Sequence, residues 1–129
     1  MKNFFRYWFP VILWAGVIFL LSQIPNLKSD LPSTWDLVFR KIAHATEYGL
    51  LSLLLLRAFR SYPSDRGFIV DVVAVLTIVV AFALSDEIHQ AAVPGRHGSF
   101  IDICIDSGGA FLGLVCVLAV RQKRLLRLW

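Results

Sequence analysis

The sequence predicts an all-α, polytopic membrane protein built as a bundle of four transmembrane helices. Hydrophobic residues make up 57% of the 129-residue chain, and the mean hydropathy of +0.68 is far above what the core of a soluble domain of this size needs. The charged residues fall in short blocks between apolar runs, which approach the roughly 20 residues that cross a bilayer. We expect one domain over residues 1–129, with helices at about 4–24, 36–56, 68–89 and 101–120.

The first predicted helix, residues 4–24, carries basic residues at its start and ends before Pro25. Its charge pattern is similar to that of a secretory signal peptide. However, Leu20–Gln23 offers no small-x-small cleavage site, so we expect an uncleaved membrane helix. The prolines and polar residues of 25–34 predict a loop before the second helix.

The second predicted helix, residues 36–56, is apolar only in its later half. Its first turns contain the ionisable side chains of Arg40, Lys41, His44 and Glu47. Hydropathy alone therefore scores this segment weakly as a membrane helix.

The third and fourth predicted helices are more apolar. Residues 68–84 form a largely apolar run, which Ser85, Asp86 and Glu87 interrupt before the helix ends near residue 89. The fourth helix, residues 101–120, carries acidic side chains only near its start. Both segments are long enough to cross a bilayer.

Basic residues concentrate on the side that four crossings assign to both termini and to the loop between the second and third helices. Cytoplasmic loops carry an excess of Lys and Arg, so we expect both termini to be cytoplasmic, in a multi-pass protein of the cell membrane. The cations on this side are Lys2, Arg6, Arg57, Arg60, Arg66, Arg121, Lys123, Arg124 and Arg127. Membrane lipids, and not nucleic acid, are the expected partners, because no nucleic-acid-binding motif is present.

The same topology brings three polar blocks to the extracytoplasmic end of the bundle. At about 100° per residue, one face of the second helix holds Lys41, His44, Glu47 and Tyr48. On the third helix, Asp86 and Gln90 are one turn apart and Glu87 lies beside them. A stripe at three- and four-residue spacing on the fourth helix consists of Asp102, Asp106, Gly109 and Gly113.

Two interpretations of these polar blocks are open. Ionisable groups in membrane segments cost about 2.5–3.5 kcal/mol each at a helix centre, so they normally face the bundle interior or water. The structural interpretation is that Lys41, Arg96 and the acids pair with one another, or form a solvated rim at headgroup level. The number and variety of the groups favour a functional site. Gly109 and Gly113 predict a close helix contact.

The polar blocks resemble the motifs of VanZ-like membrane proteins. Lys41–Leu50 is similar to the K-x-x-H-x-x-E-Y motif of that family. Three further segments are similar to family motifs. Asp86–Gln90 is similar to the D-E-x-x-Q block, Pro94–Arg96 to the P-x-R block and Asp102–Gly109 to the D-x-x-x-N/D-x-x-G block. The motifs follow in the same order and cover nearly the whole chain. Asp106 departs from the Asn that the family often has there. The resemblance implies an integral membrane protein of a family linked to resistance against glycopeptide antibiotics, teicoplanin in particular.

The polar site predicts action on an anionic envelope lipid or a lipid-linked sugar precursor. In this hypothesis, the acid-base group is His44, and Glu47 or Asp86 orients it. The headgroup phosphate is held by Lys41 and Arg96. The catalytic candidates are His44, Glu47, Asp86, Glu87 and Asp102, and the substrate-binding candidates are Lys41, Tyr48, Gln90, Arg96 and Asp106.

Three alternatives use the same residues. The histidine and the carboxylates offer ligands for a divalent metal, although no H-E-x-x-H or paired-cysteine signature is present. A non-enzymatic protein could bind the lipid or the antibiotic without bond chemistry. An ion or proton carrier is the weakest alternative, because four helices without a repeat give little machinery for alternating access. The sequence leaves the substrate, the cofactor and the oligomeric state open.

Overall fold

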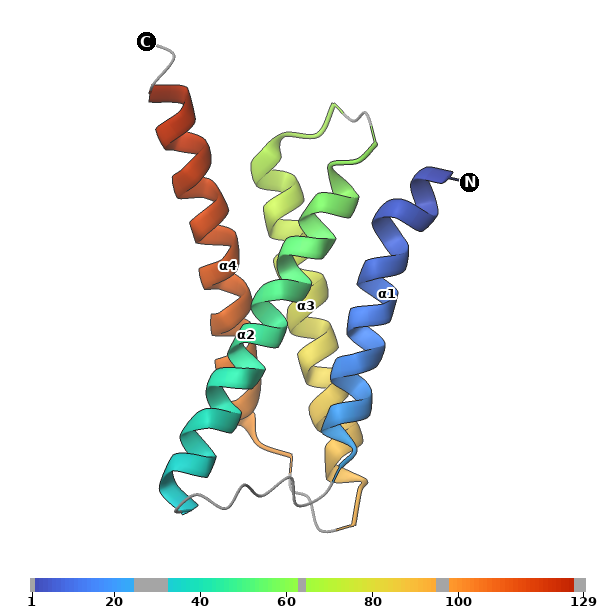
Figure 1. Cartoon of the computed structure of the whole chain (residues 1–129), viewed down its shortest axis with the longest axis vertical. Coiled ribbons are helices and arrows are strands. Elements are labelled where there is room, and N and C mark those ends of the chain that lie inside the picture. Colours follow the sequence, from blue (N-terminus) through green and yellow to red (C-terminus); the bar gives the residue numbers. More distant parts are fainter. Residues whose placement is uncertain (1, 25–32, 63–64, 95–97, 127–129) are drawn as a thin grey trace.

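The computed structural model of the chain consists of four α-helices (Figure 1). It describes residues 2–24, 33–62, 65–94 and 98–126. The helices are α1 (Lys2–Ser22), α2 (Ser33–Phe59), α3 (Phe68–Ala91) and α4 (Phe100–Leu126). The all-α prediction is confirmed. Each helix differs from its predicted range by a few residues, most at the end of α4, where good helix formers such as Arg121 and Gln122 continue the helix.

Three of the four helices are long and apolar enough to cross a membrane. These segments are Phe4–Ser22, Phe68–Ala91 and Phe100–Gln122. The expectation of four such helices is therefore supported for three. Helix α2 has the length, at 27 residues, but the charged side chains of its first half lower its hydropathy.

The helices run alternately up and down the bundle. The beginning of α1, the end of α4 and the connection between α2 and α3 lie at one end, which we call the terminal end (Figure 1). Helix α2 contacts all three other helices, and α4 most extensively. Since Lys41 meets Asp102 and Gly49 meets Gly113, α2 and α4 run parallel to each other.

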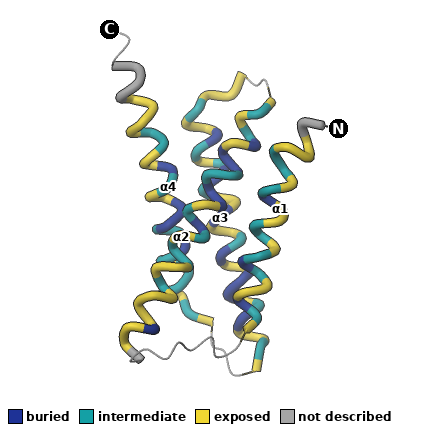
Figure 2. The backbone as a smooth tube through the Cα atoms, viewed as in Figure 1, coloured by how far each residue is buried: buried dark blue, intermediate teal, exposed yellow. Residues whose placement is uncertain are grey.

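The buried core is apolar in the middle of the bundle. Its fully buried side chains come from all four helices and include Ile18, Tyr48, Leu51, Val75, Val79 and Leu114. Large apolar side chains also cover the outside, as the exposed positions along each helix in Figure 2 indicate. Such an apolar exterior is typical of a surface that faces lipid.

Glycines bring α2 and α4 into close contact. A Cβ atom added at Gly109 would lie 2.0 Å from the carbonyl oxygen of Ala45, and one added at Gly113 would lie 3.0 Å from the carbonyl oxygen of Gly49. The hydroxyl of Ser52 crosses the same contact and donates to the carbonyl of Ala110 at 3.2 Å. The close helix contact predicted from the two glycines is confirmed.

Two half-exposed arginines pair with a buried carboxylate of α3 at the terminal end. Asp71, in the first turn of α3, is 2% exposed. The Nη1 atom of Arg60 lies 3.0 Å from its Oδ2, and the Nε atom of Arg66 lies 3.7 Å from its Oδ1. Because the buried Asp71 carboxylate would lack a compensating charge without these arginines, the contacts stabilise the connection between α2 and α3.

Candidate functional site

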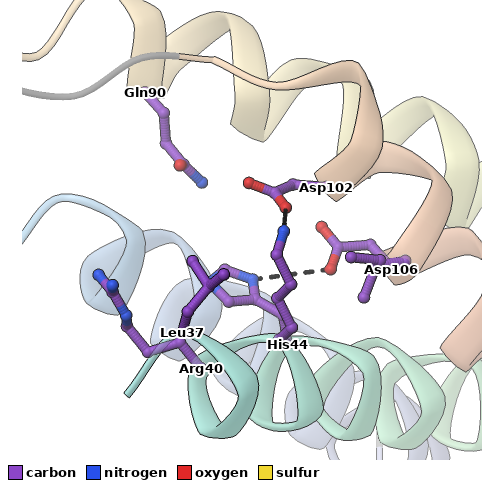
Figure 3. A pocket seen from close by; sticks show the side chains of 8 residues that line it. Leu37, Arg40, His44, Gln90, Asp102 and Asp106 are labelled. Carbon is purple, nitrogen blue, oxygen red and sulfur yellow. Dashed lines mark hydrogen bonds and ion pairs between the residues drawn. The ribbon is translucent and has the colours of Figure 1, made fainter. Parts of the chain in front are cut away.

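A polar pocket lies between α2, α3 and α4 at the end of the bundle opposite the terminal end. Its volume is about 110 Å³. The residues that line it, most of them labelled in Figure 3, are Leu37, Arg40, Lys41, His44, Gln90, Asp102, Ile105 and Asp106. Helix α2 supplies the groups that can carry positive charge, and α4 supplies the carboxylates. The pocket is therefore a place where helical periodicity on two parallel helices brings opposite charges together.

Two contacts one helical turn apart cross the pocket from α2 to α4. The ammonium group of Lys41 donates a hydrogen bond to Oδ1 of Asp102. The imidazole Nδ1 of His44 lies 3.6 Å from Oδ1 of Asp106 (Figure 3). Both Lys41 and Asp102 are about one-third exposed, so these two side chains can exchange their partner for a ligand.

Asp106 is the most deeply buried acid of the pocket. Its side chain is completely buried, and neither carboxylate oxygen receives a hydrogen bond from any residue that the structure describes. The carboxylate points toward His44 in Figure 3. An ionised carboxylate taken out of water needs a compensating charge or hydrogen bonds, and among the described residues His44 is the group nearest to supply that charge to Asp106.

A second polar group, the Asp86 cluster, lies beside the pocket and consists of Asp86, Ser22, Tyr48 and Gln90. Asp86 is completely buried and accepts hydrogen bonds from the Ser22 hydroxyl at 2.5 Å and from the Gln90 amide nitrogen at 2.9 Å. The Tyr48 hydroxyl donates to it at 3.5 Å. Gln90 also lines the pocket, so this side chain connects the two groups.

The remaining predicted site residues lie outside the pocket wall that the structure describes. Glu87 is buried and accepts a hydrogen bond from the backbone N–H of Ser99 at 2.6 Å, which places its carboxylate at the beginning of α4. Glu47 is partly buried, and its backbone carbonyl accepts a hydrogen bond from the indole of Trp14 at 2.9 Å. Arg96 lies outside the described residues.

Several residues of the site were not singled out from the sequence. The hydroxyl of Ser22 comes from the far end of α1, where only an apolar run was apparent. Arg40 lines the pocket and pairs with the buried Asp36 one turn earlier, at 3.1 Å. Leu37 and Ile105 complete the wall. The Arg40–Asp36 pair could have been found from its i, i+4 spacing, whereas Ser22 carries no such signal.

Among the described residues, no three His, Cys, Asp or Glu side chains come close enough together to hold a metal ion. The acids are divided instead between separate partners. Asp102 pairs with Lys41, and Asp86 accepts a hydrogen bond from Ser22. Glu87 accepts a hydrogen bond from the backbone N–H of Ser99, next to the first residue of α4. The described geometry thus favours hydrogen bonding and ion pairing as the chemistry of this site.

Comparison with known proteins agrees with the motifs. The model of the VanZ/LLP1 family matches residues 4–121, which include most of all four helices and every residue that lines the pocket. No curated protein and no solved structure matches the chain. The match confirms the resemblance to VanZ-like membrane proteins, and this chain is therefore a member of the VanZ/LLP1 family.

Proposed function

We propose that this protein is a multi-pass protein of the cell membrane that binds the headgroup phosphate of an envelope lipid, or of a lipid-linked precursor, in the polar pocket. The observation that carries the proposal is the gathering of Arg40, Lys41 and His44 on one wall of one pocket. Guanidinium and ammonium groups are the side chains that bind phosphate through charge-assisted hydrogen bonds. Arg96, in the P-x-R block, is a further candidate for the same phosphate.

The proposal includes α2 as a fourth crossing. Its polar face is directed at α4 through Lys41 and His44, while Phe39 and Ile42 are exposed on its other faces. Charged side chains in membrane helices are tolerated when they face the bundle interior and pair there. This arrangement supports a pocket that opens near the extracytoplasmic headgroups, with both termini in the cytoplasm.

His44 is the group that we assign to proton transfer. Its side chain is 26% exposed, so it can reach a ligand in the pocket, and Asp106 stands behind it to orient the ring and stabilise its protonated form. A carboxylate behind a histidine is the usual arrangement for an acid-base group. A protein that only binds the headgroup would use Arg40 and Lys41 and would not depend on His44 for chemistry.

The first prediction separates these two classes. Envelope lipids and lipid-linked precursors are compared between a deletion strain and strains restored with wild type, His44→Ala or His89→Ala at equal membrane abundance. For an enzyme, a precursor accumulates in the deletion strain and falls at least about tenfold with wild type but not with His44→Ala.

The matched control is His89→Ala. The ring centroids of His89 and Phe19 are 4.4 Å apart, and His89 does not line the pocket. This variant should behave as wild type. Full rescue by His44→Ala would reject the acid-base role, and an unchanged lipid profile in the deletion strain would leave binding without catalysis as the function. Susceptibility to teicoplanin is a second readout of the same strains.

A further inference from the structure

The pocket holds as much negative as positive charge. Its two permanent cations, Arg40 and Lys41, each have a carboxylate partner, in Asp36 and Asp102. Asp106 adds another carboxylate, near His44. A ligand that carries only negative charge would be attracted by these cations but repelled by the carboxylate of Asp106. A balanced pair of charges is instead complementary to a ligand that carries both signs.

Asp106 identifies where the positive part of such a ligand binds. Its carboxylate is completely buried, lines the pocket, and receives no hydrogen bond from the described residues. Buried carboxylates are stabilised by N–H donors that carry positive charge. The amide of Gln90 lines the same pocket and offers a carbonyl oxygen as a further acceptor.

We infer that the headgroup bound in the polar pocket is zwitterionic, with its phosphate against Arg40 and Lys41 and a primary ammonium group against Asp106. The inference rests on the proposed function and specifies its ligand. An aminoethyl phosphate has this chemistry, because two carbons separate its ammonium group from its phosphate. The pocket, at about 110 Å³, is smaller than the roughly 300–1,000 Å³ of sites for drug-sized ligands. The ammonium end therefore enters the pocket, and the phosphate stays at the more exposed cations.

Three headgroups test the inference: two zwitterionic ones that differ in the N–H donors and the size of the ammonium group, and one without an ammonium group. The full-length protein in detergent is titrated calorimetrically with dihexanoyl phosphatidylethanolamine and with dihexanoyl phosphatidylcholine, whose trimethylammonium group has no N–H. Dihexanoyl phosphatidylglycerol supplies hydroxyl groups in place of the amine. Wild type should bind the ethanolamine lipid at least about tenfold more tightly than the other two.

The variant Asp106→Asn keeps the shape of the side chain and removes its charge. It should abolish the preference for the ethanolamine lipid over the choline lipid, which at least about tenfold tighter binding defines in wild type. Asp65→Asn, at an exposed position near the terminal end, is the control and should match wild type. If Asp106→Asn does not fold, the preference of wild type for the ethanolamine lipid over the glycerol lipid, whose headgroup has no ammonium group, still decides the question.

The outcomes separate this inference from the proposed function. Equal, Arg40- and Lys41-dependent binding of the ethanolamine and choline lipids would overturn the ammonium site and leave the phosphate site standing. Phosphatidylglycerol binding as tightly as the ethanolamine lipid, with dependence on Asp106, would also overturn it in favour of a hydroxyl. Absence of binding to all three lipids would reject the proposed function itself.

Discussion

The carboxylate of Asp86 joins three helices through single hydrogen bonds. It lies on α3, accepts from Ser22 on α1 and Tyr48 on α2, and is oriented by Gln90 one turn along its own helix. A buried carboxylate that loses a donor retains the full cost of its desolvation. Each donor in the cluster therefore contributes to stability as well as to the position of Gln90 on the pocket wall.

The second prediction tests this at Ser22. Ser22→Ala removes the 2.5 Å hydrogen bond to a completely buried carboxylate and should lower the free energy of unfolding by about 1–3 kcal/mol. Thermal unfolding of the protein in detergent measures the loss. Ser85→Ala is the matched control, because the exposed Ser85 hydroxyl donates to the carbonyl of Phe82 within its own helix. If the two variants melt at the same temperature, the Ser22 hydroxyl does not support Asp86.

At the scale of elements, the contact between α2 and α4 determines the site. The two helices approach until their backbones touch at Gly49 and Gly109, and the pocket lies immediately before that contact along both helices. Close packing of this kind is how membrane helices associate in the absence of a hydrophobic driving force. The distance from Lys41 to Asp102 is therefore set by residues that carry no charge.

The third prediction concerns this contact. In Gly109→Ala, the new Cβ would lie 2.0 Å from the oxygen and 2.6 Å from the carbon of the Ala45 carbonyl, so α2 and α4 must separate. We expect a destabilisation of at least about 1–3 kcal/mol and a loss of headgroup binding. The neighbouring Gly108 has open space at its Cβ position, so Gly108→Ala should retain wild-type melting and binding. Equal behaviour of the two variants would contradict the helix contact.

Periodicity explains why much of the site was predictable. Lys41 and His44, like Asp102 and Asp106, are three or four residues apart, so each pair shares a face of its helix wherever the helix packs. Ser22 could not be found in this way, because its partner is 64 residues away and no repeat relates them. The weak hydropathy of α2 also followed directly from its charged first half.

For the whole molecule, the two ends of the bundle differ in chemistry. The pocket end holds most of the acids, whereas arginines pack on aromatic rings at the terminal end. Arg121 lies 4.1 Å from the ring centroid of Phe68, and Arg60 lies 5.5 Å from the same ring. Arg57 packs on Tyr7 in the same way. Such side chains suit the boundary between an anionic leaflet and water.

The fourth prediction fixes the orientation. In a background of Cys104→Ala and Cys116→Ala, single cysteines are introduced at two exposed positions, Asp65 near the terminal end and Ala92 after α3. A membrane-impermeant thiol reagent should label Ala92→Cys in intact cells, and Asp65→Cys only after permeabilisation. The reverse pattern would place the pocket on the cytoplasmic side.

The crossing of α2 and α4 has a mechanical consequence. Helices α2 and α4 cross each other (Figure 1), and their backbones come closest at the glycine contact. A rotation of one helix relative to the other would therefore pivot about this contact. The pocket lies between α2 and α4 on one side of this contact, and the arginine-bearing ends of the two helices lie on the other side. A change in the crossing angle therefore alters the separation at both ends together, so that the packing at the arginine-bearing end is coupled to the width of the pocket.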